Sequence, residues 1–325
     1  MRCLSLAQVL RDVHGCRVSF WMNQDDIGIS WVKQAGWPVA LVAQGEMMAS
    51  GDAGHIHGLI VDLPGGASAE EIRALRDAHP GVVILLMDGT GTGRLTADLV
   101  VAPIDRQPEA STWAGFRGER CAGPAYAILD LAYLDVPKRV RVERVPRILV
   151  AMGGSDPHGL TLQALRALDR MPEAMEFVVA VGPAFLHEAE LQGWLLTGHH
   201  ASTIAREPSL LKLMVSSDVA VVSFGTTVYE LAATGLPAIA LSISEDHLEA
   251  ADVFAQFGSM TSLGLFSSVE DETVQGAIRR VLNDRALWQS MAERGQSTVD
   301  GKGAERVAER LVARIYNQWE SRADG

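Results

Sequence analysis

Short apolar runs alternate with segments of helical periodicity along nearly the whole chain. Uninterrupted apolar runs bounded by Gly, Pro or Asp are typical of parallel strands that are covered by helices on both faces. Such runs lie at residues 16–22, 38–42, 58–63, 82–87 and 98–102, and again at residues 147–152, 176–181, 219–224 and 237–242. Helical patterns lie at residues 25–35, 160–168, 269–281 and 304–319, and Ser68 is placed to cap another helix. The pattern predicts an α/β protein with doubly wound parallel sheets.

A charged segment bounded by prolines, Pro137 to Pro146, interrupts this alternation near the middle of the chain. We interpret it as a solvated linker between domains. Its basic residues are Lys138, Arg139, Arg141 and Arg144. We therefore expect two Rossmann-like domains facing a cleft, formed by residues 1–143 and residues 144–325, and the second of them includes the C-terminal helices.

The chain opens directly on a helical pattern, Met1 to Leu10. In nucleotide-binding α/β domains a buried strand and a Gly-rich turn normally precede such a helix. That strand lies at the centre of the sheet, so its loss leaves unpaired backbone groups that each cost about 1–3 kcal/mol. A domain stable by about 5–15 kcal/mol does not tolerate many of them. We expect the N-terminal domain as written to lack its first strand, and a start codon assigned too late is the explanation that we favour.

The composition narrows the class of protein. With 48% hydrophobic and 21% charged residues the chain is globular, and its net charge of −12 argues against nucleic-acid binding. The three cysteines are far apart and lack metal-type spacing, which indicates reduced thiols. Neither a signal peptide nor an apolar stretch of about 18 residues is found, so we expect a cytoplasmic protein.

The first candidate site is the turn Gly153-Gly154-Ser155-Asp156, which follows an apolar strand and precedes a helix. The glycines allow close approach of the backbone to a ligand, and a helix N-terminus favours an anion. Ser155 adds a hydroxyl donor, so the turn suits a diphosphate. An ordinary tight turn in which Ser155 or Asp156 caps the helix explains the same residues.

A second turn of this kind contains Gly225, Thr226 and Thr227, again after an apolar strand, and Glu230 follows one helical turn later. The two hydroxyls suit phosphate oxygens, and the Glu230 carboxylate suits a ribose diol. A solvent-facing glutamate is the simpler alternative for Glu230. Two such turns at one edge of one sheet favour nucleotide binding over coincidence.

Weaker candidates lie at other strand ends. Asp246 and His247 follow the strand that ends near Ser242 and are candidates for sugar or phosphate contacts, although Asp246 explained as a helix cap is equally simple. Asp88 ends another strand, before the Gly-rich segment 89–93, and with Tyr126 it is a substrate-side candidate. His55 and His57 lack further ligands nearby, so no metal site is expected.

Six segments together resemble a known family. They are Met1–Ala7, Gly123–Tyr126, Gly153–Asp156, Gly225–Leu231, Gly235–Pro237 and Asp300–Ala304. They are similar to the UDP-sugar hydrolases of pseudaminic acid biosynthesis and the related spore-coat polysaccharide proteins, which are relatives of the glycosyltransferase that makes lipid II. The resemblance covers essentially the whole chain. It implies a GT-B fold and hydrolysis of a UDP-linked acetamido sugar without metal or cofactor. By resemblance, Gly154 and Ser155 face the diphosphate, Thr226 and Thr227 hold phosphate oxygens and Glu230 holds the ribose.

Two departures from the family pattern bear on function. Asp246-His247 stands where the family usually has Asn-Gln. The catalytic histidine of the family is expected two positions upstream of Met1, so no catalytic residue is assigned. Three functions remain open: a UDP-sugar hydrolase, which the resemblance favours, a glycosyltransferase that uses the same donor, and a non-catalytic nucleotide-sugar binding protein if Met1 is the true start.

Overall fold

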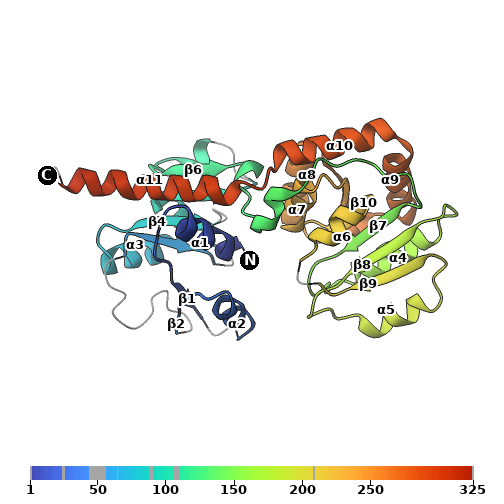
Figure 1. Ribbon diagram of the computed structural model, residues 1–325, viewed down its shortest axis with the longest axis horizontal. Coiled ribbons are helices and arrows are strands. Elements are labelled where there is room, and N and C mark those ends of the chain that lie inside the picture. Colours follow the sequence, from blue (N-terminus) through green and yellow to red (C-terminus); the bar gives the residue numbers. More distant parts are fainter. Residues whose placement is uncertain are drawn as a thin grey trace. The chain divides into compact units, whose positions relative to one another are not determined.

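A computed structural model of the chain is shown in Figure 1 and describes residues 2–23, 26–43, 56–63, 65–87, 91–104, 110–207 and 209–323. Asp88, His55, Gly89 and Thr90 lie outside the described residues. The chain divides into two compact units. The first unit consists of Met1–Leu131 and Gly301–Gly325, and the second of Ala132–Asp300.

The second unit contains a six-stranded parallel sheet in the order β12-β11-β10-β7-β8-β9. The strands are β7 (Arg147–Ala151), β8 (Glu176–Ala180), β9 (Ala201–Ala205), β10 (Val219–Ser223), β11 (Ala238–Ser242) and β12 (Met260–Leu265). Ile148, Leu149 and Val150 of β7 are fully buried, because helices cover both faces of the sheet. The apolar run predicted this arrangement correctly.

Seven α-helices connect and cover these strands in the described part of the second unit. They are α4 (Leu160–Asp169), α5 (Glu188–Leu195), α6 (Leu211–Ser216), α7 (Thr227–Ala233), α8 (Glu245–Ala255), α9 (Asp271–Asn283) and α10 (Arg285–Thr298), with the short 3-10 helix η5 (Phe266–Ser268). Residues of α4, α9 and α10 share one apolar core with β7, β8 and β10, which includes the buried Trp288 and Phe177. The second unit is thus a parallel sheet covered by helices, a Rossmann-like unit as the sequence predicted.

The first unit has two parallel sheets among the described residues, β1-β2 and β3-β4-β5-β6. The strands are β1 (Phe20–Met22), β2 (Val39–Leu41), β3 (Gly58–Val61), β4 (Val83–Met87), β5 (Leu99–Ala102) and β6 (Glu119–Ala122). The helices are α1 (Arg2–Asp12), α2 (Asp26–Gln34), α3 (Ala69–Ala78) and α11 (Gly303–Ala323), with the 3-10 turns η1 (Thr92–Thr96), η2 (Ala110–Trp113) and η3 (Pro124–Tyr126). The strands do not form one continuous sheet, because within the described residues β1 pairs only with β2 and β3 only with β4.

The C-terminal helix α11 belongs to the first unit rather than to residues 144–325. Its apolar stripe, with Val307 and Leu311, shares a core with Leu6 and Leu10 of α1. The entry into α11 is tight, because a Cβ on Gly303 would lie 2.0 Å from the carbonyl oxygen of Ala127. The boundaries therefore differ from the predicted 143/144 division at both ends of the second unit.

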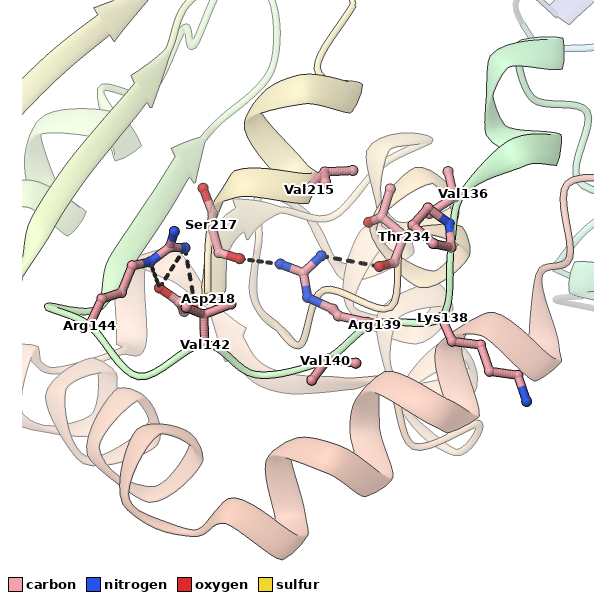
Figure 2. Close-up of a pocket in the computed structure, with 11 residues that line it drawn as sticks. Val136, Lys138, Arg139, Val140, Val142, Arg144, Val215, Ser217, Asp218 and Thr234 are labelled. Atoms are coloured by element: carbon pink, nitrogen blue, oxygen red, sulfur yellow. Dashed lines mark hydrogen bonds and ion pairs between the residues drawn. The ribbon is translucent and has the colours of Figure 1, made fainter.

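The segment Ala132–Pro146, here called the strap, is the first part of the second unit and includes all but the first residue of the 3-10 helix η4 (Leu131–Asp135). Figure 2 shows the Arg139 guanidinium pointing to carbonyl oxygens at the ends of α6 and α7. It donates to Met214 O at 3.0 Å, to Thr234 O at 3.1 Å and to Ser217 O. Burial lowers the pKa of Arg139 to about 10. The expectation of a solvated linker was wrong at this residue, because its charge is placed at two helix C-termini.

Candidate functional site

The two Gly- and hydroxyl-containing turns lie side by side at the carboxyl edge of the six-stranded sheet. β7 and β10 are hydrogen-bonded neighbours, with Val222 opposite Ala151. Gly153 has φ +86°, and a Cβ at that position would lie 3.9 Å from the Ser223 hydroxyl. Gly153, in the turn that follows β7, therefore lies beside the side chain of Ser223, the last residue of β10. This is also the point at which the strand order reverses, the usual ligand position in open parallel sheets.

A third loop closes on the first turn. Gly182 follows β8, and a Cβ there would lie 2.5 Å from the carbonyl oxygen of Gly154. Only glycine therefore fits at residue 182 without displacing the turn. Gly182 was not predicted from the sequence, although a glycine directly after a buried strand is a recognisable signal of close backbone approach. Ser223 belongs to the second motif of the sequence, where no role was assigned to it.

Asp156 is buried, and its side chain caps the first two N–H groups of α4, although the N-cap residue itself is Gly159. Its carboxylate accepts hydrogen bonds from Leu160 N at 2.9 Å and Thr161 N at 2.8 Å. His187, which the sequence analysis did not single out, bonds Asp156 O through Nε2 at 2.9 Å. Asp156 is the one non-glycine residue with positive φ, +44°, among the described residues. The structure therefore supports the capping alternative: Asp156 shapes the turn, and its oxygens already have donors.

The groups left facing outward are those of the turns themselves. Gly153, Gly154 and Thr226 are exposed, and Ser155 is half-buried. Since Asp156 takes up the first N–H groups of α4, the N-terminus of this helix is a weaker anion site than the sequence suggested. Backbone N–H groups and hydroxyls of the two turns are what remains for an anion.

Glu230 lies on α7 behind the second turn. It is half-buried, and it shares a helix face with Thr226 and Thr227 because residues three and four apart are neighbours on a helix. The Thr226 hydroxyl makes no capping bond to α7. A ligand on these hydroxyls therefore lies within one helical turn of the Glu230 carboxylate.

His247 approaches the second turn and Asp246 does not cap α8. The cap is Ser244, whose hydroxyl accepts from His247 N at 3.3 Å. The His247 ring packs against Phe224 with centroids 6.4 Å apart, and Phe224 lies between Ser223 and Gly225. Asp246 is exposed in the first turn of α8. The helix cap that the sequence suggested at Asp246 therefore lies two residues earlier, at Ser244.

The two substrate-side candidates, Asp88 and Tyr126, belong to the first unit, whereas the two turns belong to the second. Tyr126 lies in η3 and packs, partly buried, on the core of the first unit. Asp88 is outside the described residues. In the part of the chain that the structure describes, no three His, Cys, Asp or Glu residues gather as metal ligands, and no helix there is long and apolar enough for a membrane span.

Comparison with known proteins bears on this arrangement. No family model matches the chain. The chain is 26% identical over 310 residues to the spore coat polysaccharide biosynthesis protein SpsG of Bacillus subtilis, covering 93% of this chain and 90% of SpsG. The structure superposes on MurG of Acinetobacter baumannii with a TM-score of 0.71 at 14% identity, covering 96% and 95% of the two chains. This chain is a homologue of SpsG with a GT-B fold.

Further similarities agree with the GT-B fold. The calicheamicin glycosyltransferase CalG4 superposes with a TM-score of 0.61 at 14% identity, covering 96% of this chain and 94% of CalG4. An uncharacterized protein of Methanocaldococcus jannaschii is 30% identical over 148 residues, which is 43% of this chain and 31% of that protein. The SpsG homologue therefore has the two-unit architecture that its sequence predicted.

Proposed function

We propose that this SpsG homologue hydrolyses a UDP-linked acetamido sugar to UDP and the free sugar. The observation that carries the proposal is that the Gly153–Ser155 turn and the Gly225–Thr227 turn follow the neighbouring strands β7 and β10 at the reversal point of the sheet, with Gly153 beside the Ser223 side chain. SpsG is named for spore coat polysaccharide biosynthesis. Polysaccharides are made from sugar nucleotides, so a sugar-nucleotide substrate is consistent with that name.

Each group in the proposed site has a separate role. Gly154 and Ser155 face the diphosphate with N–H and hydroxyl donors, and Thr226 and Thr227 bind phosphate oxygens. Glu230 accepts hydrogen bonds from the ribose diol. His247, next to Phe224, is proposed as a further contact to the phosphate or the sugar, and so is Asp246, which is exposed in the first turn of α8.

The chemistry assigned to this unit is stabilisation of the leaving group. The bond between the anomeric carbon and the diphosphate oxygen breaks, and its electron pair leaves with UDP. A water oxygen bonds to the anomeric carbon, and that water loses one proton to the solvent. Donors fixed before the reaction stabilise the charge that develops on the diphosphate. The proposal assigns no base to the water, and it requires neither a metal nor a cofactor.

A glycosyltransferase is the second candidate, because the donor half of the reaction is the same and MurG and CalG4 share the fold. Release of free sugar from UDP-sugar in the absence of any acceptor supports the hydrolase. Turnover only after addition of a sugar or lipid acceptor supports the transferase. UDP binding without turnover in either assay would leave a nucleotide-sugar binding protein.

Nucleotide binding itself is tested by titration calorimetry with UDP. Glu230→Ala is expected to weaken UDP binding at least about 10-fold, since a hydrogen bond to a charged group contributes about 1.5–3 kcal/mol. The matched control is Glu190→Ala, which removes an exposed glutamate of α5 in the same unit. Equal UDP affinity of Glu230→Ala and the control would refute the ribose assignment.

A further inference from the structure

Three arginines line a cavity at the amino edge of the β3–β6 sheet of the first unit. The cavity has a volume of about 320 Å³ and is lined by Arg76, Arg117, Arg314, Asp98 and the backbone of Gly115 and Gly118. Asp98 directly precedes β5 and Gly118 directly precedes β6, so this edge is opposite to the carboxyl ends of the strands. The proposed nucleotide site lies in the other unit, and the arginines have no part in it.

The arginines outnumber the carboxylates that face them. Asp98 is the one acidic residue among those that line the cavity. Its Oδ2 accepts from Arg76 at 2.7 Å and from Ile84 N at 2.8 Å, and its Oδ1 lies 3.9 Å from Arg314. Arg76 also donates to Thr96 O at 2.9 Å, so the Arg76–Asp98 pair has a structural role in tying α3 to the sheet.

Arg117 and Arg314 are not used in the same way. Arg117 is exposed and has no ion pair or hydrogen-bonded partner among the residues that the structure describes. Among the described residues, the ion-pair partner of Arg314 is Asp98, at 3.9 Å. The neighbouring carboxylate, Glu119, lies 3.2 Å from Arg310 instead. The described lining of the cavity thus has three arginines and one carboxylate, an excess of two positive charges in a protein whose net charge is −12.

The backbone holds Arg117 beside this cavity. A Cβ on Gly118 would lie 2.5 Å from Asp98 O, so only glycine allows the chain to pass this close to Asp98. At the next residue, the backbone N–H of Glu119 donates to Asp98 O at 2.9 Å. Arg117 is thereby placed at the mouth of the cavity by contacts that do not involve its side chain.

We propose that this cavity, here called the arginine notch, binds a dianionic phosphate group, either inorganic phosphate or a small phosphomonoester. Guanidinium groups bind phosphate through paired N–H donors, and a dianion matches this excess of two positive charges. A single small cavity on an acidic protein suits a small anion and not a nucleic-acid backbone.

The test is titration calorimetry of the full chain with sodium phosphate at low, constant ionic strength, repeated with glycerol 3-phosphate. Saturable one-site binding of either ligand is expected. Arg117→Ala and Arg314→Ala should each weaken it at least about 10-fold, because each removes charge-assisted hydrogen bonds. The matched control is Arg73→Ala, an exposed arginine on the same helix as Arg76 that does not line the notch.

The two ligands distinguish the source of the phosphate group. Tighter binding of glycerol 3-phosphate indicates an organic phosphomonoester, and tighter binding of inorganic phosphate indicates the free ion. The proposal is overturned if neither ligand binds saturably up to about 20 mM, or if Arg117→Ala and Arg314→Ala bind as the control does. Thermal melts of all variants confirm that the variants remain folded, since neither arginine is buried.

Discussion

Replacement of Arg139 by methionine tests whether the strap stabilises the second unit through helix ends. The guanidinium is bonded to the carbonyl oxygens of Met214, Ser217 and Thr234, which end α6 and α7. Methionine keeps much of the aliphatic volume and removes all of these donors. The strap would then cover three carbonyl groups that have lost their charged partner.

The expected loss follows from these bonds and their surroundings. An unsatisfied buried carbonyl costs about 1–3 kcal/mol, so three of them set an upper range near 9 kcal/mol. Two effects reduce it: burial disfavours the Arg139 charge, which is why its pKa falls to about 10, and the adjacent cavity of about 150 Å³ admits water to the carbonyls. We expect a loss of about 2–4 kcal/mol in the free energy of unfolding.

Urea denaturation followed by circular dichroism measures this loss. Lys138→Ala is the matched control, because Figure 2 shows the Lys138 side chain pointing away from the Arg139 contacts, and it should change stability by less than about 0.5 kcal/mol. Arg139→Lys keeps the charge but has fewer donors, so it should fall between wild type and Arg139→Met. Equal midpoints and slopes for Arg139→Met and Lys138→Ala would refute the reasoning.

Three further predictions concern the turns and one surface pair. Asp156→Ala removes the cap of α4 and should destabilise the protein by about 1–2 kcal/mol in urea and weaken UDP binding; unchanged stability would contradict the capping role. Gly182→Ala should weaken UDP binding at least about 10-fold in calorimetry, because its Cβ would displace Gly154, whereas the exposed Gly193→Ala should leave it unchanged. Burial would raise the pKa of Asp169, but hydrogen bonds from the His199 ring and from the N–H groups of His199 and His200 lower it below its ordinary value. The stabilisation that Asp169 provides over Asp169→Asn should therefore be full above about pH 5 and disappear as the pH falls below about 4, as urea midpoints at several pH values will show; a difference that grows on acidification would contradict this.

Local physics in the sequence was sufficient for the central elements of the fold. The apolar run that forms β7 is buried on both faces of the sheet. An uninterrupted apolar run is the pattern expected of such a strand. The Ser68 cap was predicted from the residue type, and the structure shows the reciprocal bonds between Ser68 and Glu71. The two turns of the candidate site follow such strands directly, and the sequence therefore placed them at one sheet edge.

Two edge strands, β6 and β9, were missed for the opposite reason, whereas the edge strand β3 was predicted. β6 contains Glu119 and Arg120, and β9 contains Ser202 and Thr203, so neither shows an uninterrupted apolar run. An edge strand is half exposed, and its pairing is determined by a neighbour that is distant in sequence. The pattern of one segment does not carry that information.

The sequence by itself determined that the last helix has an apolar stripe, that Asp156 is near a helix start and that the strap is basic. Tertiary structure alone decided that the stripe of α11 packs on α1, that Asp156 caps α4 and that Arg139 bonds two helix ends. An amphipathic pattern specifies that a face is buried but not which surface buries it. A charged residue likewise specifies a need for partners, and only the folded chain supplies their identity.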